Sequence, residues 1–366
     1  MRASVLNDAA LVKRAGQFAW LSVDVDDAAN AAFVAKAPAE GVPMFLVIDS
    51  ATGKIALSWY GAATAAQLDA MLDDGAAVIA GKASGADAVL ARADRANAEK
   101  DFVNAAAYYE QALNLGGAKW RKRPRVLESL IMAQSFAHKN EDCAATALRE
   151  APAMARDRSL VNVLYFGLEC TKPGTPQRIE LLKLAEQAVK TPGVLSDDIS
   201  QLYGEIAYGY RAEKDEAATS RVATEWVAYL RRERAKAASP DARIGLDLQL
   251  ASAASVLHKP EIALPEIERD ERELPKDYNP PRVAASLLSQ MGRLDDAVAA
   301  CSRALELAYG AAKLRMYGVC GGILSRKGDK DAAKKMYQDG IAFGRTLPED
   351  VAQPVVRSLE AALGKL

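Results

Sequence analysis

Small and large apolar residues recur at helical spacing along the last three quarters of the chain. Two stretches fit this pattern in phase, Asn279–Ala308 and Ala311–Arg345, and their corresponding positions lie 36 residues apart. Ala or Gly stands where two antiparallel helices would cross, because only small side chains let the backbones approach closely. Gly292 and Gly328 stand where a first helix should end, since glycine adopts a left-handed backbone at least cost. The pattern predicts a repeating array of antiparallel helix pairs.

The same pattern extends toward the N-terminus with varying clarity. Ala88–Gly116 repeats it well, and four weaker pairs follow at Arg125–Glu150, Leu160–Lys190, Asp197–Arg234 and Ala242–Leu274. In the last of these, Pro260 suits a first helical turn, whereas Pro265 is expected to kink the second helix. Val351–Leu366 is predicted to be a cap helix that begins near Pro354.

The three clearer stretches strongly resemble tetratricopeptide repeats, whose period is about 34 residues. The resemblance implies about seven such units over residues 85–366, followed by the cap helix. It also implies a curved superhelix whose concave inner face holds another molecule.

The first 80 residues follow a different rhythm, with short β-rich runs. Phe18–Val25 is typical of a buried strand, Ala28–Lys36 is helical in pattern, and Thr64–Asp73 is amphipathic with Leu68, Met71 and Leu72 on one side. Met44–Ile48 and Lys54–Tyr60 flank a turn at Asp49–Gly53 and are predicted to be strands.

This order, with Gly41-Val42-Pro43-Met44-Phe45, resembles the later part of a thioredoxin-like domain over about residues 1–75. The resemblance implies a cis peptide bond between Val42 and Pro43, which would be a deliberate feature of the fold. The expected fold is therefore a partial α/β thioredoxin-like domain over residues 1–80, followed by an all-α tetratricopeptide-type superhelix.

The family's first strand and its Cys-x-x-Cys motif have no counterpart here, because Met1–Val5 already matches the helix that follows them. One interpretation is that Met1 is an internal methionine, with a signal peptide, a strand and the cysteines encoded upstream. The other is a shortened domain stabilised by the repeats. The sequence as written indicates a cytoplasmic protein, since its start lacks an apolar signal region, whereas a lost signal peptide would make it periplasmic or secreted.

Composition narrows the functions further. The formal net charge is -1, which argues against general nucleic-acid binding, because that depends on a summed positive field. No run of 18 apolar residues predicts a membrane span. The basic cluster Lys119–Arg125 fits either a solvated loop or, with Trp120 stacking, a polyanion site, and the first interpretation is favoured.

Candidate chemistry is sparse. His138 and His258 are isolated at expected helix ends, and Asp24, Asp26 and Asp27 fit helix capping better than a metal site. No phosphate-binding loop, cofactor motif or catalytic constellation stands out, so neither a cofactor nor an enzymatic activity of this chain alone is expected.

The four cysteines leave two interpretations open. Cys301 and Cys320 lie at similar distances from one predicted interhelical turn, as do Cys143 and Cys170 from another, so each pair could form a disulfide in an exported protein. The alternative, slightly favoured, is four buried free thiols that pack as small hydrophobic groups.

The sequence thus predicts a scaffold that binds a protein or peptide. Tyr203 and Tyr210 are the candidate contacts on a first helix, and Val42 and Pro43 are candidates in the N-terminal part. The rival hypothesis is a thiol–disulfide oxidoreductase or redox chaperone whose active cysteines lie upstream of Met1, and a third is an assembly adaptor.

Overall fold

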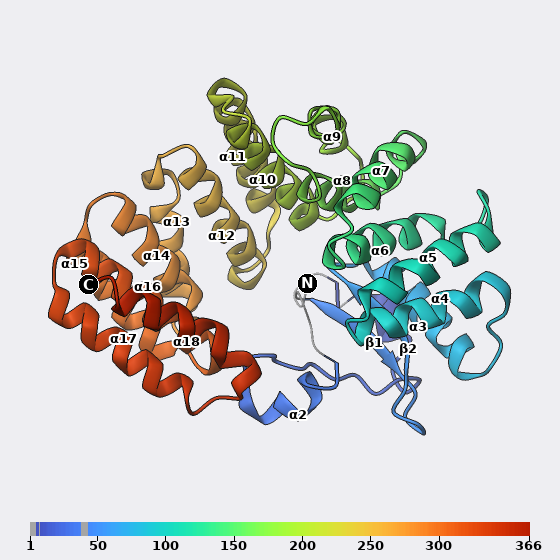
Figure 1. Ribbon diagram of the computed structural model, residues 1–366, viewed down its shortest axis with the longest axis horizontal. Coiled ribbons are helices and arrows are strands. Elements are labelled where there is room, and N and C mark those ends of the chain that lie inside the picture. Colours follow the sequence, from blue (N-terminus) through green and yellow to red (C-terminus); the bar gives the residue numbers. More distant parts are fainter. Residues whose placement is uncertain (1–4, 7, 38–42) are drawn as a thin grey trace. The chain divides into compact units, whose positions relative to one another are not determined.

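The computed structural model describes residues 5–6, 8–37 and 43–366, and these residues are mainly helical (Figure 1). Two compact units are distinguished by their internal contacts. Unit 1 comprises Met1–Trp20 and Lys36–Trp226, and unit 2 comprises Leu21–Ala35 and Val227–Leu366. The predicted division near residues 80–85 does not coincide with this grouping and stays a prediction.

Unit 1 contains the strands of the described residues, which form a two-stranded antiparallel sheet. β1 (Met44–Ile48) pairs with β2 (Ile55–Tyr60), and the ladder is irregular between Val47 and Ile48. The turn between them is closed by Asp49, whose carboxylate accepts hydrogen bonds from the Ala51 amide and the Thr52 hydroxyl. This hairpin was predicted from the sequence and is confirmed.

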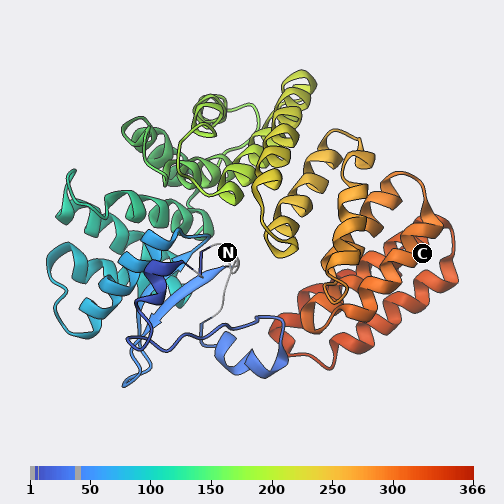
Figure 2. The ribbon, with the colours of Figure 1, turned by 180° about the vertical axis from the view of Figure 1, so that it is seen from behind.

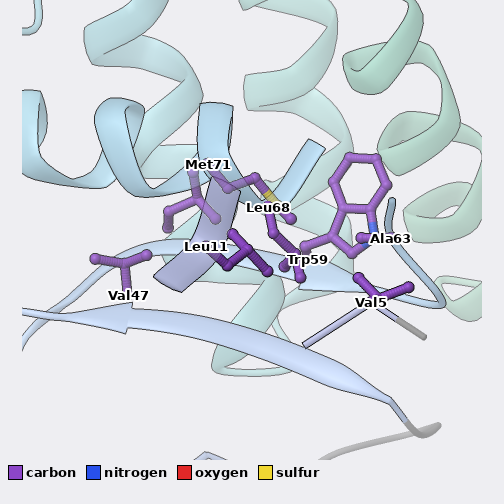
Figure 3. Packing of buried hydrophobic residues seen from close by; sticks show 8 residues of the cluster. Val5, Leu11, Val47, Trp59, Ala63, Leu68 and Met71 are labelled. Atoms are coloured by element: carbon purple, nitrogen blue, oxygen red, sulfur yellow. The ribbon is translucent and has the colours of Figure 1, made fainter. Parts of the chain in front are cut away.

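A small core holds α3 (Ala65–Ile79) on the sheet. Val47 of β1 and Trp59 of β2 pack with Leu68 and Met71 of α3, and Leu11 of α1 (Ala9–Val12) joins them (Figure 3). Thr64 begins α3 with a reciprocal capping box to Gln67, which explains why the helix starts here. The predicted amphipathic helix is confirmed and extends six residues beyond Asp73.

The predicted strand at Phe18–Val25 is wrong. This segment has one isolated bridge, from Phe18 to Ala15, and Leu21 is 82% exposed. An apolar run becomes a strand only where a neighbouring strand satisfies its backbone, and no such partner lies beside it within the described residues. With a sheet of only two short strands, a thioredoxin-like domain is not confirmed. The predicted helix Ala28–Lys36 is shorter, as a 3₁₀ turn η1 (Ala28–Asn30) and α2 (Ala31–Val34).

The rest of unit 1 consists of antiparallel helix pairs, as predicted. The pairs are α4 (Gly85–Ala98) with α5 (Phe102–Gly116), α6 (Arg123–Phe136) with α7 (Asn140–Glu150), α8 (Leu160–Glu169) with α9 (Pro176–Ala188), and α10 (Ser196–Ala212) with the first half of α11 (Glu216–Lys236). A 3₁₀ turn, η2 (Ala151–Met154), follows α7. The first helices pack in sequence, α6 on α8 and α8 on α10, and they lie side by side in Figure 1 and in the reverse view of Figure 2.

Unit 2 continues the same pattern. Its helices are α12 (Pro240–Val256), α13 (Leu264–Glu273), α14 (Asn279–Gln290), α15 (Leu294–Leu307), α16 (Gly310–Lys327), α17 (Lys330–Gly344) and α18 (Glu349–Leu363). The expected kink at Pro265 does not occur, because a 3₁₀ turn η3 (Pro260–Ile262) ends first and Pro265 lies in the first turn of α13, where its missing N–H costs nothing. The cap helix α18 begins at Glu349, so Pro354 lies inside it rather than at its start.

A left-handed residue separates the two helices in most pairs. Gly292 and Gly328 have the predicted positive φ, of 76° and 87°. His138 and His258 occupy the same place after α6 and α12 with φ of 57° and 56°, and in all four turns the next amide donates to the carbonyl five residues earlier in the first helix. The two histidines therefore serve as helix ends, as the sequence indicated.

Candidate binding face

The contact residues named from the sequence lie in different surroundings where the structure describes them. Val42 lies outside the described residues, and the Pro43 carbonyl accepts a hydrogen bond from Gly61 as the hairpin closes. Tyr203 is only 9% exposed. Tyr210 donates from its hydroxyl to Glu186 of α9 over 2.6 Å, so it braces two neighbouring helices. Neither tyrosine lies open on the first-helix surface.

The cysteines are joined in the two combinations that helix geometry suggested. Cys143 of α7 is bonded to Cys170 at the end of α8, and Cys301 of α15 is bonded to Cys320 of α16. Each bond links the second helix of one pair to the first helix of the next. The cysteines therefore connect neighbouring pairs within unit 1 and within unit 2.

The basic cluster Lys119–Arg125 is largely engaged by carboxylates. Lys122 lies between Asp74 and Asp87, at 3.0 and 3.1 Å, and Arg123 contacts Glu150 at 2.7 Å. Such pairing leaves little free positive field for a phosphate backbone. Arg123 and Arg125 lie in α6 and are ion-paired, so this part of the cluster is structural and is not the solvated loop that the sequence favoured.

Arg125 attaches the hairpin to the helix pairs. Its guanidinium donates 2.8 Å to the Asp94 carboxylate of α4 and 2.9 Å to the Ser58 carbonyl of β2. The other Asp94 oxygen accepts from the Tyr109 hydroxyl of α5, and Ser58 donates back to the Asp94 carbonyl. Asp94 and Ser58 are each 1% exposed, so this is a buried polar network that joins β2 to three helices.

Neither a metal site nor a membrane span is found among the described residues. No three His, Cys, Asp or Glu side chains converge there, and no helix is long and apolar enough to cross a bilayer. Asp27 accepts from the Ala29 amide at the start of η1, which is the capping role expected from the sequence.

Carboxylates instead gather on the surface formed by the first helices of unit 1. We call Glu128 of α6, Glu169 of α8, and Asp198 and Glu205 of α10 the acidic face. On α10, Asp198 and Glu205 are two helical turns apart and therefore share a side. The acidic face extends over three consecutive first helices.

Each of these carboxyls has a raised pKa. Burial raises the pKa of Glu128 to about 7, although hydrogen bonds from Asn162 and Ser159 oppose the rise. Burial and then the charge of Glu128 raise the pKa of Asp198 to about 8. Glu205 is raised to about 7 by burial and by Glu169, whose own pKa burial also raises. The carboxylates therefore repel one another in a partly desolvated setting.

Positive charge lies close to this face at Arg158, which lines the same hollow as Glu128 and Asp198, and at Arg211, which lies over the Tyr208 ring. Arg125 and Arg178 lower the pKa values of Glu128 and Glu205, respectively, but only as minor causes. Within the described part of the chain, Asp198 and Glu205 form no ion pair or hydrogen bond. A cation placed here would relieve the repulsion at both sites.

The acidic face includes a hollow with a mixed lining. Glu128, Asn162 and Asp198 line it from the helices, Arg158 lines it from the loop before α8, and Trp59, Thr64 and Gln67 line it from β2 and the start of α3. Asn162 donates 2.6 Å to Glu128, which holds that carboxylate in place. Further along, Tyr165 hydrogen-bonds to Glu169, and Tyr208 is 45% exposed on α10. Carboxylates and phenol rings thus alternate, as in surfaces that bind cationic side chains.

Sequence reasoning missed this face, although a signal was present. Asn162, Tyr165 and Glu169 follow at intervals of three and four on α8, and Asp198, Gln201, Glu205 and Tyr208 do so on α10. These intervals mark one side of each helix. The polar positions of the first helices, and not their aromatic positions, therefore indicate the acidic face in the sequence.

A second hollow, of about 290 Å³, lies between β2, α3 and α4. Its charged lining consists of the ion-paired Asp74, Asp87 and Lys122, together with Asp73, Lys82, Asp94 and Arg121. Lys122 pairs with Asp74 and Asp87 in this hollow, and Arg125 pairs with Asp94.

No protein-family model matches the chain, and no curated protein matches it. Among solved structures, a tetratricopeptide repeat protein from Parabacteroides merdae ATCC 43184 is 12% identical with a TM-score of 0.45, over 75% of this chain and 98% of that one. The TPR2AB domain of yeast Sti1 in its pHSP90 complex is 14% identical with a TM-score of 0.28, over 76% and 97%. At these values neither likeness decides the fold or the function.

Proposed function

We propose that the chain is a scaffold that binds a protein or peptide, and that the acidic face of unit 1 receives lysine or arginine side chains of that partner. The observation that carries the proposal is the gathering of Glu128, Glu169, Asp198 and Glu205 on the consecutively packed first helices α6, α8 and α10. Burial and mutual repulsion disfavour the ionised form of these carboxyls, and a cationic ligand would favour ionisation by forming an ion pair.

The arrangement suits an extended partner better than a small molecule. Adjacent first helices lie about 8–10 Å apart in packed helix pairs, so the face presents carboxylates over a distance that several residues of a peptide would span. The phenol ring of Tyr165 adds apolar contact, and the Tyr208 ring already binds the Arg211 guanidinium, so cations are accepted beside this face. Because the face is built on packed helices, little ordering cost falls on the scaffold when a partner binds.

An array of immobilised random 12-residue peptides, probed with the labelled full-length chain, tests this function. The wild-type chain should retain peptides enriched in lysine and arginine, and the double variant Asp198→Asn/Glu205→Gln should lose most of that retention. The matched control Glu141→Gln/Glu180→Gln removes the same charge from exposed positions of second helices and should keep it. Equal loss in both double variants, or no cationic preference in the wild type, would refute the proposal.

We further infer that the protein works in an oxidising compartment. The two disulfides support this localisation, because cytosolic reductants keep such pairs reduced in most organisms. Fractionation of the source cells with an antibody against the chain tests it, and recovery with the cytosolic fraction alone would contradict it.

A further inference from the structure

Residues Leu21–Ala35 are a segment of unit 2, although the chain before and after this segment belongs to unit 1. We call this segment the arm. It contains η1 and α2, and none of the α2 side chains is buried. Phe33 and Val34 of α2 are half-buried, so partial apolar packing and the polar contacts of the acidic turn together hold the arm in place.

The acidic part of the arm, Asp24–Asp27, is folded into a turn by its own side chains. Asp24 accepts from the Asp26 amide over 2.9 Å, and Asn30 donates to the Asp24 carbonyl over 2.9 Å. These bonds leave one carboxylate oxygen of Asp24 and both oxygens of Asp26 directed to groups outside the arm. The turn is thus shaped before it contacts the helices.

The start of α16 receives this turn through three neighbouring positions. The Tyr309 hydroxyl donates 2.6 Å to Asp24, and the Arg315 guanidinium donates to both oxygens of Asp26 over 3.3 and 3.4 Å. Between them, a β-carbon at Gly310 would overlap the Asp26 carbonyl oxygen. Glycine at 310, with a φ of 49°, is what allows the backbone of the turn to lie this close.

The contact is well matched in charge but weakly anchored. Arg315 remains 55% exposed, and solvent-exposed ion pairs stabilise a contact only slightly. Leu21 and Val25, the larger apolar residues of the arm near the turn, are 82% and 41% exposed. A segment bound in this way can be displaced by a competitor that presents the same groups.

We propose that Tyr309, Gly310 and Arg315 form a binding site for an acidic peptide turn. The turn that fits this site has two carboxylates on either side of a backbone carbonyl that lies close to Gly310. In this structure Asp24–Asp27 occupies the site, and a partner can displace it. The partner would carry an Asp-x-Asp sequence or its equivalent. Arm and partner then compete for the start of α16. This site uses other residues and the opposite charge from the acidic face, so either proposal can fail without the other.

The test uses the full-length chain with Asp24→Asn/Asp26→Asn. These substitutions preserve side-chain volume and should free the arm from α16, and we call this variant the released chain. The probe is a fluorescently labelled synthetic peptide of residues 21–35, followed by fluorescence anisotropy. We expect it to bind the released chain at least about tenfold more tightly than wild type, because a docked arm lowers the fraction of open sites. Adding Tyr309→Phe/Arg315→Met to the released chain should abolish binding.

A peptide with Asp24→Asn and Asp26→Asn is the matched control and should bind neither chain. Hydrogen exchange provides an independent readout on the chain with Arg315→Met alone, in which amides of residues 21–35 should exchange faster while those of α14 and α17 stay unchanged. Equal affinity of the peptide for wild type and released chain, binding that survives Tyr309→Phe/Arg315→Met in the released chain, or no binding to the released chain would each overturn the proposal.

Discussion

The Tyr337 ring of α17 occupies the space that a side chain at position 321 of α16 would need, because Gly321 has no β-carbon. This close approach is what the repeat pattern implied, with a small residue on the first helix and a large one on the second. Tyr337 is 5% exposed, so the contact belongs to the core of its pair.

Gly321→Ala should therefore destabilise unit 2 by about 1–3 kcal/mol, since the new methyl group would force Tyr337 out of its position. Gly322, the next residue on α16, is the matched control, because nothing lies within 4 Å of its potential β-carbon. Gly322→Ala should stabilise the helix by about 0.5–1 kcal/mol. Urea denaturation of both variants measures the difference, and a neutral Gly321→Ala would contradict the packing described here.

The buried network around Arg125 makes a second prediction. Arg125→Met should cost about 3–5 kcal/mol, because it leaves the Asp94 carboxylate buried without its ion-pair partner. The hairpin and α4 should lose hydrogen-exchange protection together. Arg121→Met, in the same basic cluster but with a side chain 73% exposed, should change stability by less than about 0.5 kcal/mol. A hairpin that keeps its protection in Arg125→Met would show that it folds independently of the helix pairs.

Asp247 of α12 and Asp270 of α13 make unit 2 sensitive to pH. Both are fully buried, and burial with mutual repulsion raises the pKa of Asp270 to about 7 while burial raises that of Asp247. The folded state thus retains a proton that the unfolded chain releases near its normal pKa of about 4. The free energy of unfolding should fall as pH rises from about 4 to about 7 and then level off.

Asp270→Asn removes that titration while keeping the shape of the side chain. The variant should be more stable than wild type at pH 8, and its stability should depend less on pH between about 4 and 7. Thermal denaturation of both proteins across this range measures the effect. A wild-type stability that rises with pH over the same range would argue against a buried protonated carboxyl.

The disulfides are tested by counting thiols in denatured protein purified without reductant. We expect none before reduction and four after it, and a lower urea midpoint for the reduced chain. The bonds span 27 and 19 residues, so each should contribute about 3 kcal/mol through restriction of the unfolded chain. Cys301→Ser/Cys320→Ser should lower the stability of unit 2 and retain the bond in unit 1. Four thiols before reduction would instead favour the free-thiol interpretation.

The helix pairs could be located from sequence because their determinants are local. Spacing of small and large residues placed nearly every helix, and glycine at 292 and 328 marked where first helices end. The hairpin could also be predicted from the sequence, since its two apolar runs flank a turn that contains Asp, Thr and Gly. A repeat built from neighbouring contacts leaves its pattern in the sequence over one period.

Other features depended on partners distant in the chain, and these only the tertiary structure decided. Phe18–Val25 has the composition of a strand but lacks a neighbour to pair with, so composition alone misled. Tyr210 stays a candidate partner contact, and its hydrogen bond to Glu186 is a relationship that the sequence did not indicate. The acidic face, the Arg125–Asp94 pair and the docking of Asp24 on Tyr309 each join residues from separate elements. Local periodicity sets which side of a helix is polar, whereas the pKa and the partner of a side chain depend on what packs against it.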